Sequence, residues 1–130
     1  MSIAESIAQR SKATRKKVGA VLVKNKQIIS DGYNGMPSGD DSDPEHLVDG
    51  NLVTKPEVLH AEENVIAKLA KYGGNGAEGA TLYITLSPCL QCAKLLYNAG
   101  ISFVYYKEEY RCTKGIDFLC KYGVQVIQIC

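Results

Sequence analysis

The segment TLYITLSPCLQCAKLLYNAGISFVYY, residues 81–106, decides the fold class. Residues 81–86 are rich in β-branched and aromatic side chains, which is typical of a strand. Pro88 fits the start of a helix, where its missing N–H costs little, and Gly100 fits the end of that helix. Residues 101–106 then predict a second strand. A strand, a helix and a strand in succession indicate two parallel strands with the helix packed on the sheet.

The same alternation continues on both sides of this segment. Residues 57–72 have helical apolar spacing, and the glycine-rich stretch 73–79 ends that helix. Residues 113–122 predict a last helix with Cys120 on its apolar face, and residues 124–129 predict the last strand.

Towards the N-terminus, the pattern changes from a helix to a hairpin. Residues 2–10 predict a short amphipathic helix. Residues 18–24 and 27–32 predict two antiparallel strands joined by a two-residue turn at 25–26. We therefore predict an α/β protein, a three-layer α/β/α domain with a five-stranded mixed sheet.

Between this hairpin and the next helix, residues 32–56 predict one long loop. Loops of this length in a compact domain are usually functional or disordered. A solvated surface is the interpretation that we favour for its acidic run, and magnesium binding is the alternative. The acidic residues are Asp40, Asp41, Asp43, Glu45 and Asp49.

Composition fits a single globular domain over residues 1–130, because 45% of the residues are hydrophobic and 22% are charged. Fifteen basic and 14 acidic residues give a net charge of +1, which argues against a general nucleic-acid binder. No apolar run is long enough to span a membrane, and the first residues lack the apolar core of a secretory signal. We expect a cytoplasmic protein.

The cysteines favour chemistry over a disulfide framework, because an odd number without a secretory signal does not form one. Two of them form a C-x-x-C motif, which indicates metal binding or redox chemistry. No role is assigned to Cys112 or Cys130. The five are Cys89, Cys92, Cys112, Cys120 and Cys130.

His60 and Glu62 open one predicted helix, and Cys89 and Cys92 open another. The two cysteines are three residues apart, so their sulfur atoms share one helix face, and the positive end of the helix dipole favours thiolates. Together with His60 they form a set of three ligands that leaves a fourth position open, as in catalytic zinc sites. Zinc there makes hydroxide available at neutral pH, and Glu62 is placed to move protons.

Two simpler interpretations of these residues are a redox pair and a structural zinc site. A redox pair of cysteines would leave His60 unused. A structural zinc would need a fourth ligand, and the remaining candidates, His46 and Cys112, lack partner spacing. The joint pattern H-x-E and P-C-x-x-C therefore favours a catalytic site.

That joint pattern is the signature of zinc-dependent deaminases. The stretch GYNGMPSG, residues 32–39, resembles a loop of one branch of these enzymes, the deoxycytidylate (dCMP) deaminases. Four other segments are similar to the same branch, so the resemblance covers nearly the whole chain. They are residues 8–12, residues 18–20, residues 60–64, and residues 93–94 together with 98–101.

The resemblance implies hydrolysis of dCMP to dUMP and ammonia, with one zinc ion held by His60, Cys89 and Cys92 and with Glu62 as the proton shuttle. It also implies contacts with the substrate. Asn34 would contact the sugar, the Ala61 backbone and the Ser87 carbonyl would hold the cytosine edge, and Tyr110 would cover the nucleotide.

A monophosphate requires cations, and residues 10–17 contain five of them. We predict that Ser11 and Arg15 contact the phosphate, whereas other members of the run face solvent. For Arg111, a phosphate contact and simple exposure both remain open.

The resemblance further implies a homohexamer that dCTP activates, with Mg²⁺, and that dTTP inhibits. The effector site would include Gly32, Tyr33, Gly35 and Asn64, with the glycines admitting a triphosphate to the backbone. A tight turn after a strand is the alternative explanation of these glycines.

Four rival functions remain. They are deamination of tRNA adenosine, deamination of free cytidine, use of dCTP as a second substrate, and a non-catalytic, zinc-dependent interaction module. A tRNA enzyme would need a broader basic surface than a chain of net charge +1 easily supplies. The interaction module would make Glu62 dispensable.

Overall fold

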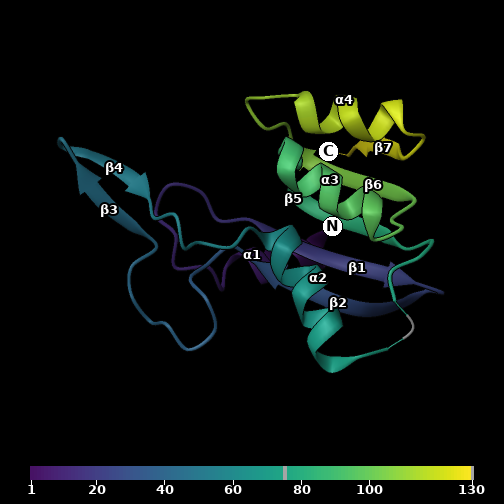
Figure 1. The fold of residues 1–130 in the computed structure, drawn as a ribbon, viewed down its shortest axis with the longest axis horizontal. Helices are drawn as coiled ribbons and strands as arrows, with labels where there is room; N and C mark the ends of the chain where they lie inside the picture. Colours follow the sequence, from purple (N-terminus) through teal and green to yellow (C-terminus); the bar gives the residue numbers. More distant parts are fainter. Residues whose placement is uncertain (75, 130) are drawn as a thin grey trace.

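The protein is described by a computed structural model that covers residues 1–74 and 76–129. Five strands form one mixed sheet in the order β2-β1-β5-β6-β7, and two more form a separate hairpin (Figure 1). The predicted α/β fold with a five-stranded mixed sheet is confirmed. The elements are α1 (Ser2–Ala8), β1 (Gly19–Lys24), β2 (Gln27–Tyr33), β3 (Glu45–Val48), β4 (Asn51–Thr54), α2 (Ala61–Tyr72), β5 (Thr81–Leu86), α3 (Leu90–Asn98), β6 (Phe103–Glu108), α4 (Lys114–Lys121) and β7 (Gln125–Gln128).

Strand directions follow the lengths of the connections. β1 pairs antiparallel with β2 and with β5, whereas β5, β6 and β7 run parallel. The β1–β2 turn contains Asn25 and Lys26, whose φ angles are 53° and 63°. Positive φ at both central residues is the geometry that matches the twist of a two-residue hairpin. The turn predicted at 25–26 is therefore confirmed.

Two glycines show how the helices cover the sheet. A Cβ atom on Gly19 would lie 2.2 Å from the carbonyl oxygen of Ala4, in α1. A Cβ atom on Gly32 would lie 2.7 Å from the carbonyl oxygen of Ala61, in α2. Gly32 pairs with Ala20, the neighbour of Gly19, and successive residues of a strand face opposite sides. Thus α1 covers one face, and α2 covers the other face together with α3 and α4 (Figure 1).

The core lies between the sheet and the three helices on its second face. Its largest fully buried side chains are aliphatic: Leu22, Leu82, Ile84, Leu96, Leu119, Val65 and Val104. In α4, Leu119 is fully buried, whereas Cys120 is exposed, so the prediction that Cys120 faces the core is wrong. One step along a helix turns a side chain by about 100°, which is enough to move it from the core to the surface.

Residues 32–56 are not one loop, as predicted, because they contain the hairpin β3–β4. The strands turn at Asp49 and Gly50, whose φ angles are 51° and 79°. Asp-Gly is a strong turn signal, and a Leu-Val pair lies on each side of it, at residues 47–48 and 52–53. The two strands were not predicted because they are short and because acids, glycines and prolines surround them. The hairpin projects from the body of the molecule (Figure 1).

The acidic run is also not uniformly solvated. Glu45, the first residue of β3, is buried, whereas the other four acidic residues of the run are exposed.

Over residues 1–74 and 76–129, no helix is long and apolar enough to cross a membrane.

Candidate active site

The ends of two helices position the metal-ligand candidates. The helices begin later than predicted, at Ala61 instead of residue 57 and at Leu90 instead of Pro88. As a result, His60 and Cys89 are the N-cap residues, both with extended backbone. The side chain of Glu63 fixes the first of these caps, because its Oε1 accepts a hydrogen bond from the His60 N–H at 2.7 Å.

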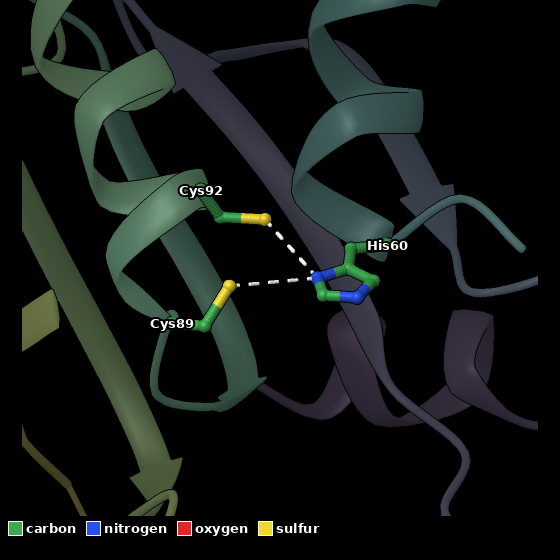
Figure 2. A group of neighbouring side chains, drawn as sticks. All are labelled: His60, Cys89 and Cys92. Atoms are coloured by element: carbon green, nitrogen blue, oxygen red, sulfur yellow. Dashed lines mark hydrogen bonds between the residues drawn. The ribbon is translucent and has the colours of Figure 1, made fainter. Parts of the chain in front are cut away.

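The three ligand candidates converge between these helix ends (Figure 2). His60 Nδ1 lies 3.2 Å from Cys92 Sγ and 3.6 Å from Cys89 Sγ. All three ligand atoms lie within 4.8 Å of one another. Tetrahedral zinc with ordinary Zn–S and Zn–N bond lengths would separate nitrogen from sulfur by about 3.6 Å. The donor set and its spacing therefore fit zinc.

Within the described residues, His60, Cys89 and Cys92 form the one group of three or more histidine, cysteine or acidic residues whose ligand atoms converge. His46 and Cys112 are not part of it. A site with three protein ligands leaves one tetrahedral position for water or substrate, which is typical of catalytic zinc.

Without a metal, the three groups share protons unequally. Hydrogen bonds from Cys92 and from His60 lower the pKa of Cys89 to about 4. The hydrogen bond with Cys89 raises the pKa of His60 to about 9. The pKa of Cys92 is raised, because its proton is held by the Cys89 thiolate and because the thiol is buried. These shifts favour a thiolate at Cys89 beside a protonated His60 and a protonated Cys92 when no metal is bound.

Glu62 lies in the first turn of α2, and its side chain reaches the same cavity as His60. The residue is only 4% exposed. Burial is the main cause that raises the pKa of Glu62 to about 7. A carboxyl group with a pKa near neutrality can both accept and release a proton during a reaction.

A cavity of about 400 Å³ lies beside the metal-ligand candidates and is lined by His60, Glu62 and Cys89. Of the six residues predicted to bind the substrate, it is lined by five: Arg15, Asn34, Ala61, Ser87 and Tyr110. Its wall also includes residues that the sequence did not single out for the site: Lys16, Glu45, Thr54 and Glu109. Arg111 lies there too. These residues come from segments far apart in the chain, including both strands of the β3–β4 hairpin, so no local motif could identify them.

Ser11 is the exception, because the structure does not bring it to the cavity. It is only 3% exposed. Its hydroxyl donates a hydrogen bond to the Asn34 carbonyl at 2.8 Å and accepts one from the Ala13 N–H at 3.2 Å. The hydroxyl of Ser11 is therefore used in hydrogen bonds to the backbone and not at the cavity. The cations on both sides of Ser11 in the sequence had suggested a phosphate contact instead.

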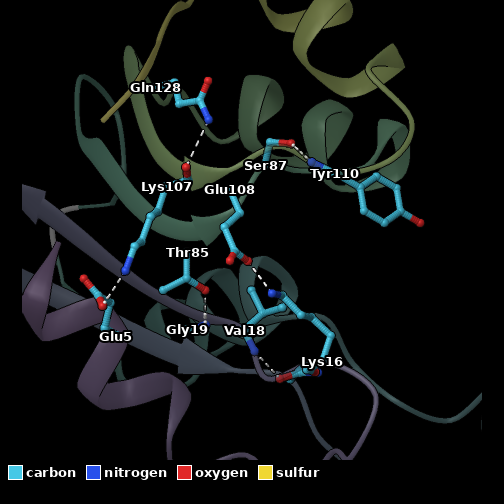
Figure 3. A network of polar contacts seen from close by, with 11 residues as sticks. Glu5, Lys16, Val18, Gly19, Thr85, Ser87, Lys107, Glu108, Tyr110 and Gln128 are labelled. Carbon is cyan, nitrogen blue, oxygen red and sulfur yellow. Dashed lines mark hydrogen bonds and ion pairs between the residues drawn. The ribbon is translucent and has the colours of Figure 1, made fainter. Parts of the chain in front are cut away.

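The side chain of Asn34 forms hydrogen bonds with the backbone of residues 16 and 18, at the end of the basic segment. Its Oδ1 accepts a hydrogen bond from the Val18 N–H at 2.9 Å, and its Nδ2 donates one to the Lys16 carbonyl at 2.8 Å. Figure 3 shows the neighbouring polar network, in which Ser87 Oγ accepts a hydrogen bond from the Tyr110 N–H at 2.7 Å. This bond anchors the loop that carries Tyr110 to the end of β5.

A second cavity, of about 390 Å³, lies along β2 and α2. All four predicted effector residues line it: Gly32, Tyr33, Gly35 and Asn64. Arg10 also lines it, with its guanidinium carbon 5.7 Å from the centre of the Tyr33 ring. Gly32 is a glycine because α2 packs against it, whereas a Cβ atom on Gly35 would make only ordinary contact with the Tyr33 ring, at 3.8 Å.

A mixed sheet that carries a His-Cys-Cys group beside a buried glutamate defines a zinc-binding α/β enzyme. The family model of the cytidine and deoxycytidylate deaminase zinc-binding region matches residues 1–108, and the chain belongs to this family. The family and the site together identify the chain as a deaminase.

Known relatives agree with this assignment over most of the chain. The crystal structure of the dCMP deaminase of cyanophage S-TIM5 in complex with dCMP and dUMP is 44% identical and has a TM-score of 0.91, covering 98% of this chain and 92% of that one. Deoxycytidylate deaminase of Enterobacteria phage T2 is 33% identical over 169 residues, covering 99% of this chain and 89% of the relative. The Homo sapiens deoxycytidylate deaminase is 40% identical over 114 residues, covering 84% of this chain and 62% of the relative.

Proposed function

We propose that this chain hydrolyses dCMP to dUMP and ammonia and so supplies dUMP for thymidylate synthesis. The observation that carries the proposal is one cavity that is lined by the buried carboxyl group of Glu62, by Arg15, and by two members of the three-ligand group, His60 and Cys89. Similarity to a deaminase whose crystal structure contains dCMP and dUMP supports the choice of substrate. The proposal treats residues 1–130 as a single deaminase domain.

His60, Cys89 and Cys92 would hold one zinc ion, which supplies the Lewis acidity that makes hydroxide available from water at neutral pH. Glu62 takes the proton of the attacking water and passes it to the ring nitrogen of cytosine. The carbon that bears the amino group gains an oxygen, and Glu62 then delivers the second proton of the water to the departing ammonia. One water is consumed, and one ammonia leaves.

The base and the sugar are held by groups at the walls of the cavity. Ala61 is the first residue of α2, so its N–H has no partner within the helix and can donate to the base. The Ser87 carbonyl would accept from the amino group of cytosine. Asn34 would contact the sugar, and Tyr110 would cover the nucleotide. Such contacts discriminate strongly against analogues that lack the matching groups.

Arg15 would bind the single phosphate. Its position at the cavity, where Arg111 adds a second guanidinium group, supports this assignment. Arginine presents a planar set of donors that matches a phosphate.

The second cavity would be the effector site for dCTP, with Mg²⁺, as activator and for dTTP as inhibitor, in a homohexamer. This cavity is lined by Gly32, Tyr33, Gly35 and Asn64 together with Arg10, whose basic side chain suits an anionic nucleotide.

The protein would act in the cytoplasm, or in the host cytoplasm if it is viral, where reduced thiols such as Cys89 and Cys92 persist.

The test is a deamination assay of the zinc-loaded protein with dCMP, deoxycytidine, CMP and dCTP as separate substrates. The proposal predicts the highest kcat/KM for dCMP. Equal turnover of deoxycytidine would contradict the role given to the phosphate. Equal turnover of dCTP would extend the substrate range, and inactivity on all four substrates with zinc bound would overturn the proposal.

A further inference from the structure

Glu45 joins the hairpin β3–β4 to the basic segment at the cavity. The residue is only 4% exposed, yet it carries a carboxylate. Its Oε1 accepts a hydrogen bond from the Thr14 N–H and its Oε2 accepts one from the Arg15 N–H, both at 2.7 Å. A buried carboxylate is retained in a fold only where such donors replace water. Both oxygens are thus committed to two successive backbone amides.

The partner strand holds the side chain of the same arginine. Thr54 pairs with Glu45 across the hairpin, and its Oγ1 accepts a hydrogen bond from Arg15 Nη1 at 3.3 Å. Arg15, Glu45 and Thr54 all line the catalytic cavity. The base of the hairpin therefore holds the backbone of Arg15 through Glu45 and contacts its guanidinium through Thr54.

We propose that Glu45 is a positioning residue for Arg15, holding the backbone of residues 14 and 15 so that the guanidinium faces the phosphate of the nucleotide. This inference rests on the proposed function, because it assumes a phosphate-bearing substrate. Glu45 does not touch the reacting atoms, so it acts only through the arginine. The negative charge of Glu45 would repel a phosphate, so Glu45 is not itself a phosphate ligand. Its two oxygens accept hydrogen bonds from backbone N–H groups instead.

The experiment compares Glu45→Gln with wild type on dCMP and on deoxycytidine. Glutamine keeps the size of the side chain but replaces one acceptor oxygen with a donor, which cannot bond to an N–H. We expect kcat/KM for dCMP to fall about tenfold, through KM, and kcat/KM for deoxycytidine to stay unchanged. Glu57→Gln is the matched control, because Glu57 is exposed.

A double-mutant cycle with Arg15→Ala separates positioning from general support of the fold. In the Arg15→Ala background, Glu45→Gln should cause no further loss on dCMP. Thr54→Val, which removes only the Oγ1 acceptor, should give a smaller loss in the same direction. If Glu45→Gln prevents folding, Thr54→Val carries the same cycle.

Three results would overturn the inference. They are an equal loss on deoxycytidine, additive losses in the cycle, and a lower KM for dCMP in Glu45→Gln, which would mean that the carboxylate repels the phosphate. A fourth such result would be unchanged hydrogen exchange of the Thr14 and Arg15 amides in Glu45→Gln, measured without any nucleotide, because the inference requires that exchange to accelerate. If wild type binds dCMP without deaminating it, the proposed function fails, and the ratio of dCMP to deoxycytidine affinities then tests Glu45.

Discussion

His60 Nδ1 lies 3.2 Å from Cys92 Sγ, although the two residues are 32 positions apart and belong to the ends of two different helices. These helix ends meet next to the carboxyl end of β5, the central strand of the sheet. Because Glu62 follows His60 by two residues at the start of α2, the same convergence places a buried carboxyl group in the cavity beside the ligands.

Zinc binding should release about two protons at neutral pH, because metal ligands must be deprotonated. His60, with a pKa of about 9, loses one, and the Cys92 thiol loses the other, whereas Cys89, with a pKa of about 4, is already a thiolate. Zinc affinity should therefore rise with pH through the neutral range. Calorimetry in buffers of different ionisation enthalpy counts the protons, and a count near zero would contradict the metal-free state described above.

Gly32→Ala should destabilise the fold, because the added Cβ would lie 2.7 Å from the carbonyl oxygen of Ala61 and 2.9 Å from the backbone nitrogen of Val65. Overpacking against backbone costs about 1–3 kcal/mol. At Gly35 the nearest atoms would lie 3.8 Å away, so Gly35→Ala is the matched control with a small effect. Thermal or urea unfolding measures both. Equal stabilities of the two variants would contradict the packing explanation of Gly32.

Arg10→Ala should weaken the response to effectors, because this arginine supplies positive charge to the second cavity beside the Tyr33 ring. The measurement is the ratio of dCMP turnover with and without dCTP and Mg²⁺, and the corresponding ratio for dTTP. We expect both ratios to move towards one, whereas Lys121→Ala, on α4, should leave them as in wild type. Unchanged ratios in Arg10→Ala would remove the effector role of this cavity.

Where a segment had a strong local pattern, the sequence predicted the structure well. The strand over residues 81–86 was predicted with its observed bounds, because an apolar, β-rich run between turn residues has few alternatives. The turn at Asn25 and Lys26 was also predicted, because two-residue hairpin turns have a narrow set of geometries. The three metal-ligand candidates and Glu62 were found because they form two pairs, His60 with Glu62 and Cys89 with Cys92, and each pair lies at a helix start.

What the sequence could not predict depends on contacts between distant segments. In the sequence, Glu45 is one acid in a run that we expected to be solvated. Its neighbours give no sign that it accepts hydrogen bonds from the amides of Thr14 and Arg15, which are 31 and 30 positions away. Ser11 looked like a phosphate ligand because it sits among cations, but its hydroxyl is bonded to the Asn34 carbonyl. Both differences between the expected and the observed position arise because burial is set by tertiary packing and not by local composition.

The central claim is that Glu62 moves the protons of a zinc-dependent deamination, and Glu62→Gln tests it most directly. The measurement is the formation of dUMP and ammonia from dCMP by wild type and by Glu62→Gln, with the zinc content of both proteins determined in parallel. Glutamine has nearly the same shape but cannot accept or release the proton, so turnover should fall by about 10²–10⁴-fold while zinc stays bound. Near-normal turnover by zinc-loaded Glu62→Gln would contradict the mechanism.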